Sequence, residues 1–177
     1  MSRPEVSAGL YQVAFVVADI EAAMQDFTDR TGAGPWFFLK DFKPYSQSYR
    51  GEPCLGESSV AFAQAGSLQI ELIMPRNGEP SPFREHIETN GYGLHHFGYL
   101  TSDFAADLAK RLNDGEAIIF EGQTSAEGGR VAVLDAGGGI SPLVELIELS
   151  AAKDFFRMIA AAAEDWNGEN PIRQLPG

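Results

Sequence analysis

Four polar residues stand at matching positions in the two halves of the chain, and their types together could bind a metal ion. Gln12 and His96 lie in the largely apolar runs "YQVAFVV" and "HHFGYLT", and Glu71 and Glu145 lie in "IELI" and "VELI". A buried, unpaired carboxylate is costly, so we expect something to compensate the two glutamates. One imidazole, two carboxylates and one amide oxygen suit Zn, Ni, Co, Mn or Fe(II). The sequence therefore predicts a divalent-metal site made by Gln12, Glu71, His96 and Glu145.

An internal duplication explains why these residues would meet. Aligning "QVAFVVADIEAAM" with "HFGYLTSDFAADL" places Asp19 on Asp103, 84 residues further on. Aligning "IELI" with "VELI" places Glu71 on Glu145, 74 residues further on. Two independent anchors indicate a repeated unit. If the two units pair their sheets about a pseudo-twofold axis, the four polar residues converge on one point.

The same order of elements is predicted in each half. The first half has a strand in "YQVAFVV", a helix capped by Asp19, and strands in "WFFLKDF", "SSVAFAQ" and "LQIELIM". After a short helix in "PFREHIETNG", the second half has "HHFGYLT", a helix in "FAADLAKRLNDG", and strands in "AIIFEG", "RVAVLDA" and "LVELIEL". We expect an α+β fold in which two paired βαβββ modules form a curved mixed sheet around a metal or ligand cavity.

We expect one domain over residues 1–177, with the first module at 10–75 and the second at 93–150. The remaining 151–177 are predicted to form a C-terminal helix and tail, because apolar residues recur at helical spacing from Ala151 to Trp166. This helix would pack on the sheet or on a neighbouring subunit.

Strand alternation assigns faces to the residues around the predicted ligands. The odd-numbered residues of the first strand, beginning with Tyr11, are expected to cover the helix, and the even-numbered ones, beginning with Gln12, to face the cavity. His95 and His96 should likewise point to opposite faces, and equivalence with Gln12 selects His96. His95 and His86 are then expected at the surface or behind the ligands.

The amino-acid composition restricts the classes of partner that the protein is expected to bind. With 13 Lys plus Arg against 25 Asp plus Glu, the net charge of −12 disfavours nucleic acid and anionic membrane surfaces. An anionic substrate would need a local basic patch, for which Arg50, Arg76, Arg84 and Arg130 are the candidates. The single cysteine, Cys54, excludes an internal disulfide. Without an apolar leader or a run of about 18 apolar residues, a soluble cytoplasmic protein is expected.

The paired modules, opened by "QVAFVV" and "HFGYLT" and closed by "IELI" and "VELI", resemble the vicinal oxygen chelate superfamily over Tyr11 to Leu149. That superfamily includes glyoxalase I, methylmalonyl-CoA epimerase, extradiol dioxygenases and bleomycin and fosfomycin resistance proteins. The resemblance implies metal ligands from the first and last strands of each module. Their order here, Gln, Glu, His, Glu, is similar to one branch of glyoxalase I. It departs from methylmalonyl-CoA epimerases, which more often have His first and Gln second, and from the two-histidine extradiol dioxygenases.

The resemblance implies a metal-dependent isomerase, epimerase or lyase that removes a proton α to a carbonyl of a small thioester or hydroxy-carbonyl substrate. Glu145 and Glu71 would move the proton through an enolate stabilised by the metal, and His96 and Gln12 would hold the metal. A glutathione hemithioacetal and an acyl-CoA thioester both fit this description. The resemblance also implies that the protein forms a homodimer. Its expected binding partner besides the second copy is a small-molecule substrate.

Two other functions remain open from the sequence. One is a non-catalytic or metal-free binding protein of the bleomycin-resistance type, in which the glutamates would be ordinary exposed carboxylates. The other is a lyase or isomerase of secondary metabolism with a larger hydrophobic substrate. The stretch "GPWFFLKDFKPYSQSYRGEP" would then line the pocket with aromatic rings, or else would form core and an ordered loop. The sequence has no GxSxG, HExxH or CxxC, which leaves a nucleophile elbow, a zincin site and a thiol pair unsupported.

Overall fold

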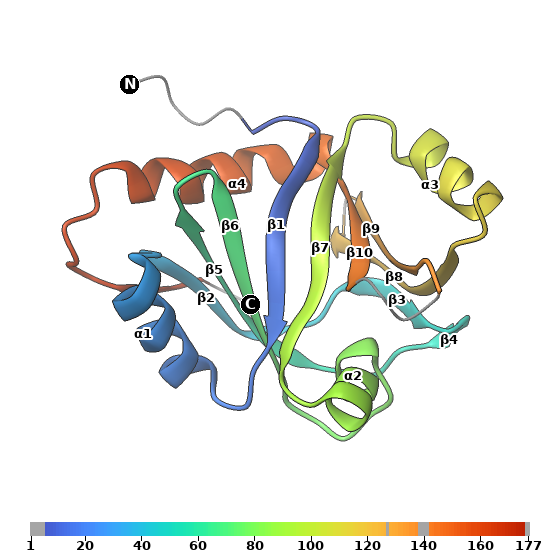
Figure 1. Cartoon of the computed structure of the whole chain (residues 1–177), viewed down its shortest axis with the longest axis horizontal. Coiled ribbons are helices and arrows are strands. Elements are labelled where there is room, and N and C mark those ends of the chain that lie inside the picture. The colour runs from blue at the N-terminus through green and yellow to red at the C-terminus, as the bar shows by residue number, and fades with distance from the viewer. Residues whose placement is uncertain (1–5, 127, 138–141, 176–177) are drawn as a thin grey trace.

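A computed structural model describes residues 6–126, 128–137 and 142–175. In this part of the chain, 11 strands form one curved sheet in the order β11-β2-β5-β6-β1-β7-β10-β9-β8-β3-β4 (Figure 1). The strands are β1 (Gly9–Val16), β2 (Trp36–Phe42), β3 (Tyr45–Tyr49), β4 (Glu52–Pro53), β5 (Ser58–Ala65), β6 (Leu68–Pro75), β7 (Gly93–Thr101), β8 (Ala117–Ser125), β9 (Gly128–Asp135), β10 (Leu143–Glu148) and β11 (Ile172–Gln174). The helices are α1 (Ile20–Thr31), α2 (Pro82–Asn90), α3 (Phe104–Asn113) and α4 (Leu149–Glu164).

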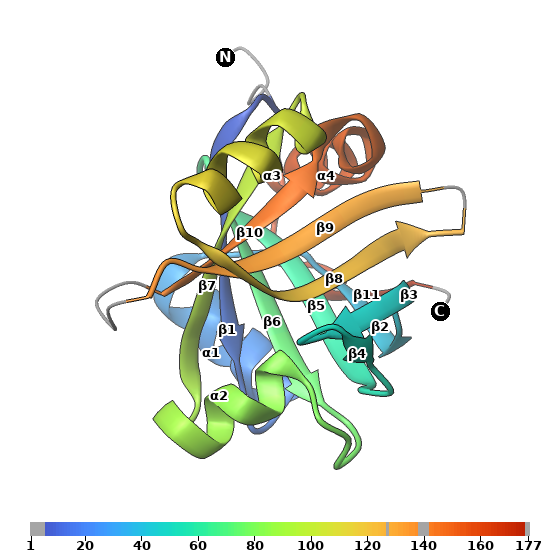
Figure 2. The same cartoon turned by 90° about the vertical axis from the view of Figure 1, so that its right-hand side faces the viewer.

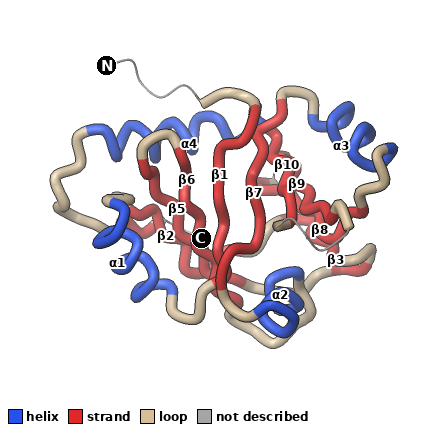
Figure 3. Tube along the Cα trace, in the orientation of Figure 1, coloured by secondary structure: helices blue, strands red, loops and turns tan. Residues whose placement is uncertain are grey.

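The predicted α+β fold with two βαβββ modules is confirmed. The first module consists of β1, α1, β2, β5 and β6, and the second of β7, α3, β8, β9 and β10. The helices α1 and α3 lie at opposite ends of the sheet, and α4 packs across strands of both modules (Figure 3). None of the helices within the described ranges is both long and apolar enough to cross a membrane.

Three short strands were not predicted. Strands β3 and β4 lie in the link between β2 and β5, and β3 pairs with β8 of the second module (Figure 2). Strand β11 adds to the other edge beside β2. Because all three are short and carry polar residues, they lack the apolar alternation that marks a strand in a sequence. The first module therefore reaches across to the edge of the second.

The duplication extends to the helix caps. The side chain of Asp19 accepts a hydrogen bond from the backbone nitrogen of Ala22 at 3.0 Å, and that of Asp103 accepts one from Ala106 at 3.1 Å. Each bond satisfies a backbone N–H at the first turn of α1 or α3 that has no partner within the helix. The two aspartates are the residues that the 84-residue repeat places in register.

The central strands β1 and β7 pair antiparallel about the expected pseudo-twofold axis. Gln12 lies opposite Gly98, and Ala14 lies opposite His96. Since Gln12 corresponds to His96 and Ala14 to Gly98 in the repeat, the pairing is reciprocal. Each module therefore presents one predicted ligand and one small residue to the other.

The β1–β7 ladder contains a bulge at Tyr11, where the register shifts between Leu10 and Gln12. A bulge re-aims the side chain of the extra residue. Tyr11 was expected to cover α1; instead its ring stacks on Phe156 of α4, with centroids 5.4 Å apart. The prediction was wrong here because strict alternation does not hold through a bulge.

The second irregularity in this ladder falls at His95, the repeat equivalent of Tyr11. Ala14 pairs with His96, but the next residue, Phe15, pairs with Leu94. His95 is buried, with 1% of its surface exposed. His95 was expected at the surface or behind the ligands, and burial contradicts the surface position. Its ring lies beside that of His96 instead of on the opposite face of the sheet.

The aromatic stretch after α1 divides between two faces of the sheet. Trp36 and Phe38 pack in the core beneath α1, where the Trp36 indole nitrogen donates to Thr28 Oγ1 at 2.9 Å. Leu39 and Phe42 instead line a cavity on the concave face. Both expectations for this stretch thus hold for different residues of it.

Candidate metal centre

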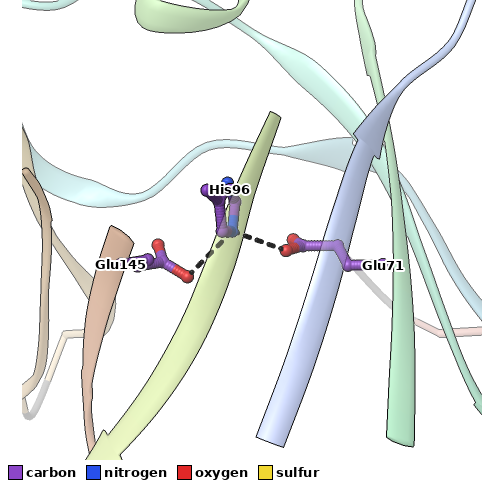
Figure 4. Close-up of side chains that lie close together, drawn as sticks. All are labelled: Glu71, His96 and Glu145. Carbon is purple, nitrogen blue, oxygen red and sulfur yellow. Dashed lines mark ion pairs between the residues drawn. The ribbon is translucent and has the colours of Figure 1, made fainter. Parts of the chain in front are cut away.

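Glu71 of β6, His96 of β7 and Glu145 of β10 converge on the concave side of the sheet (Figure 4). His96 Nε2 lies 3.4 Å from Oε2 of Glu71 and 3.4 Å from Oε2 of Glu145. One ligand atom from each residue lies within 4.8 Å of the other two. The two glutamates lie on either side of the imidazole. The structure thus brings together three of the four residues predicted from the sequence.

Small residues make this convergence possible. Ala14 of β1 pairs with Glu71 on one side and with His96 on the other, so it lies between them in a row across the sheet. A methyl group is short enough to leave the space above it open. The side chains of Glu71 and His96 can therefore approach each other over β1.

A second row of paired residues crosses the sheet two residues along the strands from the first. It consists of Gln12, Gly98 and Glu145. A Cβ atom at Gly98 would lie 2.7 Å from Gln12 Oε1 and 2.8 Å from Gln12 Cβ. Only a glycine leaves room for the amide at this point. The two rows are related by the repeat, since Gly98 is the equivalent of Ala14.

The fourth predicted residue, Gln12, lines the same cavity as the other three and is 1% exposed. Its Nε2 donates to Oε1 of Gln69 at 2.8 Å. Its own Oε1 has no hydrogen-bond partner among the described residues. A buried acceptor without a partner is unfavourable by about 1–3 kcal/mol. A cation in the cavity would satisfy it.

Burial and charge act against each other in this cluster. Burial raises the pKa of Glu71, and the neighbouring Glu145 raises it further, while His96 lowers it. Burial alone would lower the pKa of His96, but the charges of Glu145 and Glu71 outweigh it and raise this pKa to about 9. The cluster therefore attracts positive charge, in the form of a proton or a metal ion.

The donor atoms fit a divalent cation. The distances of 3.4 Å exceed the roughly 2.7–2.9 Å of a charge-assisted hydrogen bond, so the imidazole and carboxylates are spaced around a gap. Two carboxylates balance the charge of a divalent ion, and one imidazole and one amide oxygen complete a mixed N/O set. No other cluster of this kind occurs among the His, Cys, Asp and Glu side chains of the described residues.

His95 lies behind His96 and contacts its ring. Its Nδ1 lies 2.8 Å from Nδ1 of His96, and the rings of Phe83 and His86 on α2 lie 5.0 Å from its own. Burial, together with the charges of His96 and His86, lowers the pKa of His95 well below its ordinary value. A neutral His95 can accept a hydrogen bond from the N–H of His96 Nδ1, which leaves the lone pair of His96 Nε2 free on the side of the carboxylates.

A position behind the predicted ligands was one of the two expected for His95, but its direct contact with the His96 ring was not expected, because that contact depends on the bulge. His95 would have pointed away from His96 in a regular strand. His86, which was also expected at the surface or behind the ligands, lies behind His95 on α2.

A cavity of about 340 Å³ opens over the cluster and is lined by residues of both modules and α4. None of the four arginines considered for an anionic substrate lines it. Arg76 forms an ion pair with Asp41, Arg50 with Glu85 at 2.6 Å, and Arg130 with Glu148 at 2.7 Å. Glu148 thus binds an arginine away from the cluster, as its opposite strand parity to Glu145 implies.

Comparison with known proteins gives one family. A family model described as the glyoxalase/bleomycin resistance protein/dioxygenase superfamily matches residues 11–133. The uncharacterized protein YqjC of Bacillus subtilis (strain 168) is 30% identical over 121 residues, which cover 63% of this chain and 85% of that protein.

Solved structures share the fold at lower identity. The hypothetical protein BH1468 from Bacillus halodurans C-125 matches with a TM-score of 0.60 and 22% identity, over 80% of this chain and 94% of that one. Methylmalonyl-CoA epimerase from Mycobacterium tuberculosis matches with a TM-score of 0.56 and 20% identity, over 86% and 97%. These identities are evidence for the fold.

Proposed function

Because the chain belongs to the glyoxalase/bleomycin resistance protein/dioxygenase superfamily, we propose that it is a divalent-metal-dependent isomerase, epimerase or lyase. It would remove a proton from the carbon next to a carbonyl group of a small substrate. The observation that carries this proposal is the pair of carboxylates, Glu71 and Glu145, that flank His96 on the wall of a cavity. The methylmalonyl-CoA epimerases among the structures of similar fold agree with this class of reaction.

Gln12, Glu71, His96 and Glu145 are the proposed ligands. A divalent cation held there would act as a Lewis acid toward two neighbouring substrate oxygens and so stabilise negative charge on them. Gln12 would contribute its unpartnered Oε1, and His96 its Nε2. His95 would fix the orientation of the His96 ring through the contact between their Nδ1 atoms.

The two glutamates would move the proton. Their side chains are 11% and 15% exposed, so both are shielded from bulk water while still lining the cavity. A carboxylate within reach of the substrate carbon can act as the general base. Because the two come from opposite sides of His96, one can take a proton from one face of the substrate carbon. The other can then return a proton to the opposite face, which inverts the carbon.

The metal is tested first by mass spectrometry of protein purified without a histidine tag. We expect about one first-row metal per chain in the wild type and loss of it in His96→Ala. His86→Ala is the matched control, since it removes a histidine near the cluster that is not a proposed ligand, and it should retain the metal. Equal metal content in wild type and His96→Ala would overturn the ligand assignment.

A second candidate is a small-molecule binding protein without catalysis, and the apolar lining of the cavity favours it. The two functions differ in turnover. An enzyme should exchange the α-proton of a bound hydroxy-ketone with deuterium from the solvent many times per chain, as followed by NMR. A protein that binds metal and the ketone without any exchange would be a binder.

A further inference from the structure

We propose that the substrate, beyond the two oxygens that face the metal ligands, is uncharged and apolar, with an aryl or branched alkyl group held in the cavity. The inference rests on the proposed function, because it assigns the substrate class of that same site. It disfavours substrates whose remaining part carries carboxylates or phosphates inside the cavity.

The walls of the cavity carry the argument. Among the described residues, the lining holds no Asp, Glu, His, Lys or Arg side chain other than Glu71, His96 and Glu145. Apolar side chains make up most of the rest, and six are phenylalanines: Phe42, Phe62, Phe83, Phe120, Phe155 and Phe156. A charged group placed among them would lose its hydration without gaining a partner.

The polar residues of the lining add no charge to the cavity. They are neutral, and several already use their side chains within the protein. Gln47 Nε2 donates to the carbonyl of Gly56 at 3.0 Å, and Thr124 Oγ1 donates to that of Gly129 at 3.2 Å. These groups add hydrogen-bonding atoms to the lining but no positive charge.

Helix α4 closes the cavity with aromatic rings. Phe155 meets Phe62 of β5 edge-on with centroids 5.5 Å apart, and Phe156 stacks on Tyr11. Because α4 packs on β5, β9 and β10, it covers the concave face where the two modules meet. The part of a substrate that leaves the metal ligands would therefore run along phenyl rings.

Charge balance at the ligands points the same way. A divalent ion between two carboxylates and a neutral imidazole leaves the site without net charge. It would favour two chelating oxygens but give no excess positive charge to hold further anions. The three arginines in ion pairs with Glu85, Asp41 and Glu148 are engaged outside the cavity.

The cavity size limits the occupant. A volume of about 340 Å³ is at the lower end of the range of roughly 300–1,000 Å³ for small-molecule sites. It suits a single ring or a short branched chain next to the chelating oxygens.

Three hydroxamates test the inference, because each presents the same two adjacent oxygens to a metal and differs only in the attached group. Binding of acetohydroxamate, benzohydroxamate and 4-carboxybenzohydroxamate to the Zn²⁺-loaded protein is measured by calorimetry. We expect benzohydroxamate to bind at least about tenfold more tightly than acetohydroxamate, since its ring is buried. The carboxylated compound should lose at least about tenfold relative to benzohydroxamate.

A pair of variants on α4 locates the effect. Phe155→Ala should reduce the preference for benzohydroxamate over acetohydroxamate several-fold, because Phe155 lines the cavity. Met158→Ala, on the same helix but 42% exposed and outside the lining, should leave the preference as in the wild type.

The outcomes separate the inference from the function on which it rests. Binding of all three hydroxamates with equal affinity would overturn the apolar substrate class and leave the metal site standing. A protein that takes up no Zn²⁺, or whose bound Zn²⁺ attracts no hydroxamate, would overturn the proposed function and this inference with it. Equal loss of preference in both α4 variants would also contradict the assignment to the cavity wall.

Discussion

The two predicted ligands at the module junction, Gln12 and His96, are repeat equivalents with different support. The residue before each is displaced in a bulge of the β1–β7 ladder, Tyr11 in one case and His95 in the other. Tyr11 stacks on Phe156 of α4, which lines the cavity. His95 contacts the ring nitrogen of His96 and packs on α2. The repeat has kept the backbone geometry of the site while the chemistry of its two halves has diverged.

The divergence shows in how each ligand is oriented. Gln12 is held by Gln69 on β6, the neighbouring strand. The equivalent of Gln69 in the second module is Leu143, which cannot hydrogen-bond through its side chain. His96 instead forms a hydrogen bond with His95 of its own strand, which the bulge at His95 allows. A bulge thus replaces a cross-strand polar partner.

The largest effect is expected from replacing Glu71 or Glu145, one from each module. Because the two are repeat equivalents, we expect both replacements to reduce activity by a similar factor. Glu71→Gln and Glu145→Gln should each lower the rate of α-proton exchange at least about 100-fold, because a glutamine can still offer an oxygen but cannot take a proton. Exchange is measured by NMR in deuterated solvent on both enantiomers of a chiral hydroxy-ketone. If each glutamate serves one face, each variant should lose exchange mainly with one enantiomer.

Glu148→Gln is the control for this pair, since Glu148 lies on the same strand as Glu145 but binds Arg130. It should exchange protons at the wild-type rate. If one glutamate variant lost exchange with both enantiomers and the other variant kept full activity, a single module would carry all the proton transfer.

The next effect concerns the partners of the ligands. His95→Ala should weaken metal binding roughly 10- to 100-fold, which is typical when a residue that orients a ligand is lost. Gln69→Leu introduces the side chain that the second module has at the equivalent position, Leu143. This variant should weaken metal binding less, because the neutral amide oxygen of Gln12, which Gln69 orients, is a weaker ligand than the imidazole of His96. Metal affinity is measured by competition with a chromophoric chelator. A larger loss of metal affinity in Gln69→Leu than in His95→Ala would mean that the partner of Gln12 matters more for metal binding than the partner of His96.

The sequence predicted the two modules and the convergence of Glu71, His96 and Glu145, because both depend on local patterns and on the repeat. The alternation in β1 and β7, the caps Asp19 and Asp103, and the pairing of Glu71 with Glu145 positions can all be read along one chain. These suffice to predict two modules and a shared cavity. The family model supports the same fold.

The parts that were missed depend on contacts between distant segments. A bulge at Tyr11 or His95 arises only when β1 and β7 pair, so neither residue signals it in its own strand. Strand β3 forms because β8 of the other module offers an edge. The place of the aromatic rings could not be assigned either, since Trp36 and Phe42 come from the same predicted strand.

A smaller effect is expected at the centres of the two rows, where the modules differ by one methyl group. Gly98→Ala gives the second row the residue of the first, Ala14. The new Cβ would lie 2.7 Å from Gln12 Oε1, so Gln12 must move, and we expect a loss of about 1–3 kcal/mol in the free energy of unfolding. Urea denaturation measures it. Gly78→Ala is the control, because the nearest atom to its Cβ is 3.9 Å away. Unchanged stability in Gly98→Ala would mean that the two rows are interchangeable.

The smallest effect distinguishes α2 from α4, which follow the last strands of the two modules. Helix α2 is held through Glu85, which accepts hydrogen bonds from Tyr49 and from Arg50, the latter at 2.6 Å. Partial burial alone would raise the pKa of Glu85, but the bonds from Tyr49 and Arg50 outweigh it and lower this pKa. A lowered pKa in the folded state stabilises the protein above the ordinary value of 4.5, and this contribution is lost as the pH falls below it.

Because the side chains of Arg50 and Glu85 are 55% and 39% exposed, solvent screens their interaction, and the contribution should stay below about 1 kcal/mol. The free energy of unfolding of Glu85→Gln should therefore differ from that of the wild type near neutral pH and approach it in acid. Phe156→Leu, which loosens the apolar contact of α4 with Tyr11, should lower stability equally at both pH values. A difference for Glu85→Gln that does not change with pH would mean that α2, like α4, is held by packing alone.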